Sequence, residues 1–123
     1  MENILEFTLQ EREIAISFLV LQINRDYLVL IAGGDAHIGS ITVGNQKEIH
    51  NKSIGKHKEY IITNTMFSEL IGKCEESLCV IGGVHIDHIT KRQIEIIKQI
   101  CEKAANQISD FLKNTKDKEV KHG

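Results

Sequence analysis

Proline and tryptophan are absent from this sequence of 123 residues, and aromatic residues make up only 5% of it. The lack of proline excludes a proline-rich linker, and no other low-complexity segment or internal repeat is present. No apolar run approaches the ~20 residues that cross a bilayer. Residues 1–6 lack the basic start and the long apolar stretch of a signal peptide. We therefore expect a cytoplasmic protein without a membrane segment.

An excess of basic residues is also missing, because the chain has 15 lysine and arginine residues and 17 aspartate and glutamate residues. Surfaces that bind nucleic acid usually carry such an excess, so we expect no nucleic-acid partner. Cysteine is scarce as well: Cys74, Cys79 and Cys101 make an odd number without a Cys-x-x-Cys spacing. Each lies in an apolar pattern, which predicts three buried thiols in a reducing compartment.

Apolar and β-branched residues dominate the first half of the chain, which favours strands. Turn signals such as Asn24-Arg25-Asp26 and Gly33-Gly34-Asp35 separate the runs. The expected strands cover residues 4–10, 14–23, 27–32 and 38–43. This order predicts an antiparallel meander within the first 54 residues.

The second half of the chain changes to helical spacing. Apolar residues recur every four positions from Ile62 to Cys74, as on one face of a helix. The β-branched residues within 61–65 lower the helix propensity there. The helix could therefore start near residue 58, or near residue 64 after a short strand. Another short strand is expected at residues 78–81.

Thr90 and Gln93 form a capping-box signature that predicts a final helix of about 23 residues, or roughly 35 Å. The residues expected to form its buried face are Ile94, Ile97, Cys101, Ala104, Ile108 and Phe111. The sequence thus predicts an α+β fold, an antiparallel β-meander with two helices packed on one face. Residues 1–113 would form a single domain and residues 114–123 a polar C-terminal tail.

Strand 14–23 is apolar on both of its faces, but two helices cover only one face of a sheet. The other face would then expose a large apolar surface, which usually marks an interaction site. We therefore expect a homodimer.

Three short segments combine glycine with histidine at the ends of apolar runs. Glycine permits sharp turns and close backbone approach, and four of the six histidines lie in these segments. The segments are Gly33-Gly34-Asp35-Ala36-His37-Ile38-Gly39, Gly55-Lys56-His57-Lys58-Glu59 and Gly82-Gly83-Val84-His85-Ile86-Asp87-His88.

The middle segment suggests an anion site at Gly55, Lys56 and His57. A helix that begins just after it would direct its first N–H groups and the positive end of its dipole towards this loop. A phosphate or a carboxylate would be stabilised there. A basic loop exposed to solvent explains this segment equally well.

The outer two segments could line a ligand site. Gly39 would leave space for a ligand beside His37, although a simple hairpin turn also explains this segment. In an extended stretch, His85 and Asp87 share a face, and ligands favour strand ends that lead into a helix.

Catalysis and metal binding find less support in the sequence. Neither a Gly-x-Ser-x-Gly nucleophile motif nor a standard zinc spacing is present, so we expect no catalytic residue and no metal site. A small metal-dependent decarboxylase or lyase that uses His85, Asp87 and His88 is the alternative.

The order of these motifs, followed by a long terminal helix, resembles the family of small prenylated-flavin chaperones over residues 12–113. This family includes the small D subunit of gallate-type decarboxylases and is similar in fold to proteasome-assembly chaperones. The resemblance implies a homodimeric, non-catalytic accessory protein that holds prenylated FMN or FMN for a decarboxylase large subunit. The cofactor-binding residues would be His37, Gly39, Gly55, Lys56, His57, His85 and Asp87. A chaperone that binds only protein is the alternative.

Overall fold

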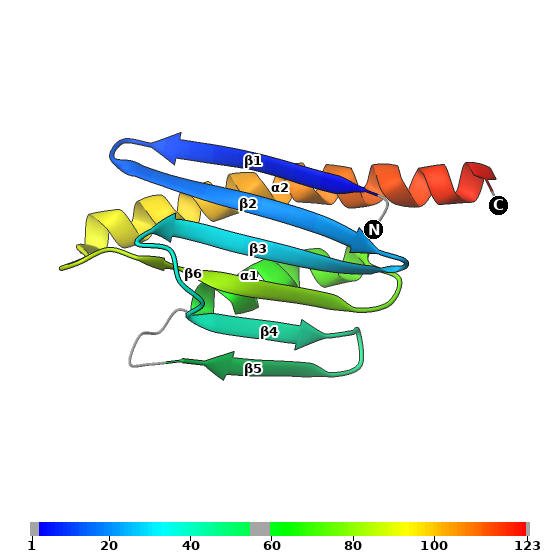
Figure 1. The fold of residues 1–123 in the computed structure, drawn as a ribbon, viewed down its shortest axis with the longest axis horizontal. Coiled ribbons are helices and arrows are strands. Elements are labelled where there is room, and N and C mark those ends of the chain that lie inside the picture. The colour runs from blue at the N-terminus through cyan, green and yellow to red at the C-terminus, as the bar shows by residue number, and fades with distance from the viewer. Residues whose placement is uncertain (1–2, 55–59, 123) are drawn as a thin grey trace.

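The apolar start of the chain forms an antiparallel meander of three strands, β1 (Ile4–Glu11), β2 (Ile14–Ile23) and β3 (Asp26–Gly34). It is seen in a computed structural model that describes residues 3–54 and 60–122 (Figure 1). Every second residue of β2, from Ile14 to Gln22, is buried. This alternation is the pattern of a strand with one covered face.

The second part of the sheet departs from the sequence prediction. β4 (Ser40–Gly44) and β5 (Ile49–Ser53) form a hairpin, but β6 (Leu78–His85) lies between β3 and β4, giving the order β1-β2-β3-β6-β4-β5. β6 pairs with β3 in parallel, so the expected meander is interrupted after β3. β6 is apolar on both faces and occupies the sheet interior, whereas the polar β5 forms an edge.

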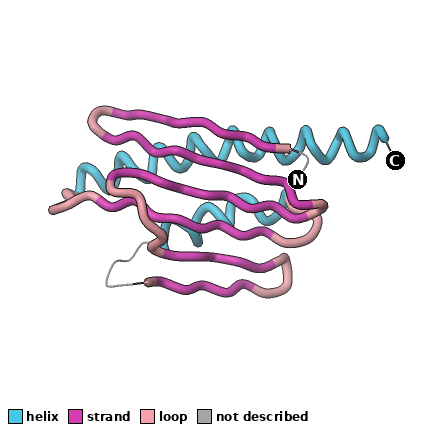
Figure 2. The backbone as a smooth tube through the Cα atoms, in the orientation of Figure 1, coloured by secondary structure: helices cyan, strands magenta, loops and turns pink. Residues whose placement is uncertain are grey.

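Two helices cover one face of this sheet, as predicted, and the α+β fold class is confirmed. They are α1 (Tyr60–Leu70), which continues into the short 3₁₀ helix η1 (Ile71–Lys73), and α2 (Lys91–His122). Figures 1 and 2 show both helices behind the strands, with α2 running along β1 and β2. The hydrophobic core fills the space between the helices and the sheet. Within the described residues, no helix is long and apolar enough to cross a membrane.

A cluster of buried hydroxyl groups fixes α1 on the sheet. The side chain of Thr63 lies 3.0 Å from the hydroxyl of Ser40 and accepts a hydrogen bond of 2.9 Å from Thr42. Since α1 already includes residues 60–63, the alternative start near residue 64 is wrong. The other expected start, near residue 58, lies outside the described residues.

The start of α2 confirms the capping box. The backbone N–H of Gln93 donates to the Thr90 hydroxyl over 3.1 Å, and the N–H of Thr90 donates to the Gln93 side chain over 3.0 Å. The helix has 32 residues and continues to His122, beyond the expected 23 and through most of the expected polar tail. Its polar last turns carry no strong stop signal, which explains why the sequence placed its end too early.

The buried face of α2 differs from the expected one at its beginning. Ile97, Ala104 and Ile108 are buried as predicted, and Cys101 and Phe111 are partly buried. Ile94 is 41% exposed, so its assignment to the core is wrong. Figure 1 shows the first turn of α2 beyond the end of β3, where no strand lies opposite the helix.

Candidate functional site

The first and third glycine–histidine segments meet at one end of the sheet. β3 and β6 are parallel neighbours, and their pairing ends with Gly34 opposite His85. The backbone N–H of Asp35 then donates to the carbonyl oxygen of His85 over 3.0 Å. In open sheets, ligand sites favour the carboxyl ends of parallel strands, and this end is where the two segments come together.

Gly34 permits this close approach of the two strands. Its φ is +61°, in the left-handed region. A Cβ at this position would lie only 2.0 Å from the carbonyl oxygen of His85. The glycine therefore sets how near Asp35 can come to His85.

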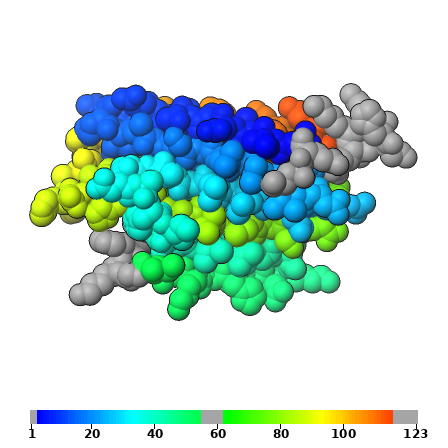
Figure 3. Space-filling model, viewed as in Figure 1, coloured from blue at the N-terminus to red at the C-terminus, as the bar shows by residue number. Residues whose placement is uncertain are grey.

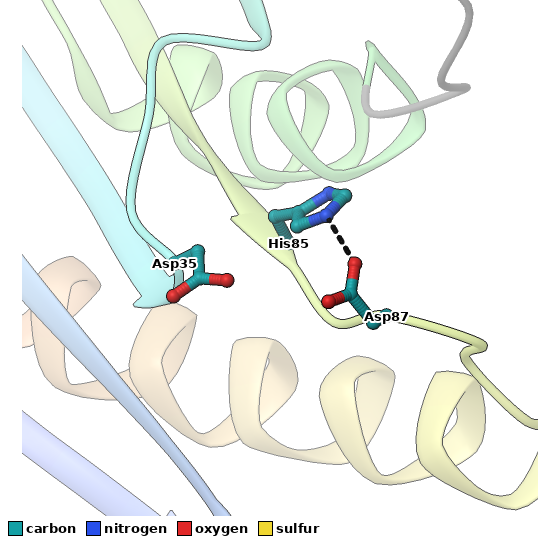
Figure 4. A group of neighbouring side chains, drawn as sticks. All are labelled: Asp35, His85 and Asp87. Carbon is teal, nitrogen blue, oxygen red and sulfur yellow. Dashed lines mark hydrogen bonds and ion pairs between the residues drawn. The ribbon is translucent and has the colours of Figure 1, made fainter.

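The side chains at this end include two imidazole rings and two carboxylates. His85 Nε2 lies 3.0 Å from Asp87 Oδ1, and the two side chains are 29% and 79% exposed. The ring of His37 meets the ring of His85 edge-on, with centroids 5.6 Å apart. Asp35 lies on the other side of His85, and Figure 4 shows its carboxylate directed towards the His85–Asp87 pair.

Gly39 connects this site with the end of β5. Its N–H donates to the carbonyl oxygen of Gly82 over 3.0 Å, and its own carbonyl oxygen accepts a hydrogen bond of 2.8 Å from the N–H of Ile54. Gly55, Lys56 and His57 directly follow Ile54 but lie outside the described residues. Their role as a phosphate site therefore stays a prediction.

The sequence did not single out Asp35 as a site residue, although it stands inside the first segment. Its proximity to His85 depends on the parallel pairing of β3 with β6, which the sequence did not indicate. His88, considered as a possible ligand, is exposed and has a left-handed φ of 54°. It is not in the group formed by Asp35, His85 and Asp87.

The face of the sheet opposite the helices carries two apolar rows. In one row Leu19, Leu30, Ile81 and Ile41 stand side by side across β2, β3, β6 and β4. The second row consists of Leu21, Leu28, Cys79 and Val43. All eight side chains are only partly buried, and Figure 3 shows the broad surface that the strands form on this side.

Polar residues border most of these rows. Glu6 of β1 pairs with Leu19, and Lys52 and His50 of β5 pair with Ile41 and Val43. On the β1 side, the second row continues into Ile4, which pairs with Leu21 and is 60% exposed. An apolar area with a polar border is the usual composition of a protein interface.

A separate hollow of about 280 Å³ lies between α1 and α2, on the side of the helices. Its lining includes Met66, Ile97 and Cys101. Of the expected cofactor-binding residues that the structure describes, none lines it. Burial, followed by the nearby carboxylates of Glu69 and Glu102, raises the pKa of the Cys101 thiol to about 12. Its described lining offers a thiol that resists ionisation and no imidazole, so this hollow is a weaker candidate than the end of the sheet.

All three cysteines remain thiols, as expected. Only Cys74 is fully buried, whereas Cys79 and Cys101 are partly buried. The expectation of three buried side chains is therefore wrong for these two. Cys79 belongs to an apolar row on the face without helices, and α2 leaves one side of Cys101 open to the hollow.

Comparisons with known proteins agree with this architecture. A crystal structure described as a novel chaperone complex for yeast 20S proteasome assembly is similar, with a TM-score of 0.62 and 7% sequence identity. The match covers 89% of this chain and 97% of that one, and at this identity it shows a shared fold. No curated protein matches the sequence. The family model for the prenylated flavin chaperone LpdD-like domain matches residues 10–113. The chain therefore belongs to the family of LpdD-like prenylated flavin chaperones.

Proposed function

We propose that this protein is a non-catalytic chaperone that binds prenylated FMN or FMN and serves a partner decarboxylase in the cytoplasm. The observation that carries the proposal is the family match over residues 10–113, which spans nearly the whole fold. The meeting of His37 with His85 at the end of the sheet supports it, because these rings offer aromatic and polar contacts to a flavin.

The flavin phosphate would be held by Gly55, Lys56 and His57. Two observations support this placement. The basic loop stands between β5 and α1 in the sequence, and a helix start favours anions. The hydrogen bond from Ile54 to Gly39 brings the residue before the loop to the segment that carries His37.

Titration of the purified protein with FMN and with riboflavin, which lacks the phosphate, tests this proposal. We expect FMN to bind more tightly than riboflavin. The affinity for FMN should fall as the salt concentration rises, since phosphate contacts are largely electrostatic. Lys56→Glu should reduce FMN affinity at least tenfold, whereas Lys73→Glu, an exposed position on η1, should not. His37→Ala and His85→Ala should each lower the affinity for FMN and for riboflavin by a similar factor.

Two results would contradict the proposal in different ways. Equal affinity for FMN and riboflavin would remove the phosphate site while leaving flavin binding in place. No binding of either flavin or of prenylated FMN would favour a chaperone that binds only protein.

We also propose that the protein is a homodimer joined through the two apolar rows on the face of the sheet without helices. Face-to-face packing of two sheets would bury both rows in a layer about 10 Å thick. The arrangement is self-complementary about a twofold axis, as a symmetric dimer requires.

Sedimentation at micromolar concentration tests the dimer. The wild type should show about twice the mass of one chain. Leu30→Arg, in the middle of the first row, should give a folded monomer, because burying an unpaired charge in the interface is unfavourable. Ile38→Arg, at a position 57% exposed outside the strands, should remain dimeric. A monomeric wild type, or a dimeric Leu30→Arg variant, would refute the assigned interface.

A further inference from the structure

The end of the sheet holds a set of side chains suited to a cation. One ligand atom from each of Asp35, His85 and Asp87 can be chosen so that all three lie within 4.8 Å of one another. We propose that these residues form a binding site for one divalent transition-metal ion. The metal site shares His85 and Asp87 with the proposed flavin site, and its test uses the metal alone, without flavin.

The distances are close to those that a bound ion requires. Ligand atoms about 2.1 Å from one ion lie at most about 4.2 Å apart. The 3.0 Å between His85 Nε2 and Asp87 Oδ1 already suits two adjacent ligands. The 4.8 Å limit for the three ligand atoms is longer than the maximum of about 4.2 Å, so the carboxylate of Asp35 would turn inward on binding, which its exposed position allows.

The backbone holds the ligands on two firmly paired segments. Asp35 follows β3 directly, and His85 ends β6, with the hydrogen bond of 3.0 Å from Asp35 N–H to the His85 oxygen between them. The edge-on contact with His37, at 5.6 Å between ring centroids, restricts rotation of the His85 ring. Three ligands from two neighbouring strand ends are thus partly organised before an ion arrives.

The donor atoms decide which ions fit. Two carboxylates would balance the charge of a dication, and the imidazole nitrogen favours Mn²⁺, Co²⁺ or Zn²⁺ over Mg²⁺. With three protein ligands, at least one coordination position would remain open to water or to an anionic ligand.

Two measurements on protein without an affinity tag test the proposal. They are calorimetric titration with Zn²⁺ and absorption spectroscopy with Co²⁺. We expect one ion per chain, a Co²⁺ spectrum in the visible range, and at least tenfold weaker binding of Mg²⁺. Asp35→Asn, Asp87→Asn and His85→Ala should each weaken Zn²⁺ binding at least tenfold. Circular dichroism should confirm that each variant is folded.

Two controls separate this site from general affinity of surface histidines. His50, on β5, lies 3.4 Å from Glu48, which is two positions earlier in the sequence. This pair therefore matches the two-residue separation of His85 and Asp87, but it is not part of the group of three. His50→Ala and His88→Ala should bind Zn²⁺ as the wild type does. The proposal would be overturned if the wild type bound no ion at 1 mM, on the order of the weakest metal sites of proteins, or if Asp35→Asn and His50→Ala had equal effects.

Discussion

The close approach of β3 to β6 makes Gly34→Ala the most informative single change. At the φ of +61° found for Gly34, a residue with a side chain is disfavoured by roughly 1–2 kcal/mol. The new Cβ would also lie 2.0 Å from the His85 oxygen, so the strand ends must separate. Separation breaks the hydrogen bond from Asp35 to His85, a loss of about 0.5–1.5 kcal/mol.

These two effects together should lower the free energy of unfolding by roughly 1.5–3.5 kcal/mol. Urea unfolding followed by circular dichroism measures this loss. All variants should be compared at one protein concentration, because the stability of an oligomer depends on concentration. Gly72→Ala is the matched control, since a Cβ at Gly72 would meet nothing within 4 Å.

If Gly34→Ala is no less stable than Gly72→Ala, the strand ends tolerate a side chain and the role given to Gly34 is wrong. If the strand ends do separate, Asp35 moves away from His85. The Zn²⁺ affinity of Gly34→Ala should therefore fall, while that of Gly72→Ala should not change. Loss of stability without loss of Zn²⁺ affinity would indicate that Asp35 is not a ligand.

Two further predictions concern α2. Ile97→Ala should lower the free energy of unfolding by roughly 2–5 kcal/mol, as for other large-to-small changes at buried sites. Ile94→Ala, on the exposed side, should lower it by less than about 1 kcal/mol. Similar losses for the two variants would mean that the buried face is misassigned. Burial raises the pKa of Cys101 to about 12, while the unfolded thiol ionises near pH ~8.5. Stability should therefore decline with rising pH between these values, and Cys101→Ala should make urea unfolding less sensitive to pH there. An unchanged pH dependence would contradict this.

The local patterns of the sequence were enough for most of the secondary structure. Alternation in β2 and helical spacing in α2 each arise from residues close together in the chain, so they can be read without knowing the fold. The capping box at Thr90 is likewise a local interaction, and the structure contains it as expected. The end of α2 was misplaced because helix ends without a clear stop signal depend on weak preferences.

The sequence by itself determined the α+β class, the helix-covered sheet, and the segments that carry His37 and His85. The position of β6 was decided only by the tertiary structure, because a strand that is apolar on both faces can pair between any two others that complete its hydrogen bonds. That placement brought Asp35 beside His85, two residues fifty positions apart in the numbering. No local pattern contains such a contact, since parallel pairing joins strands through a long crossover connection.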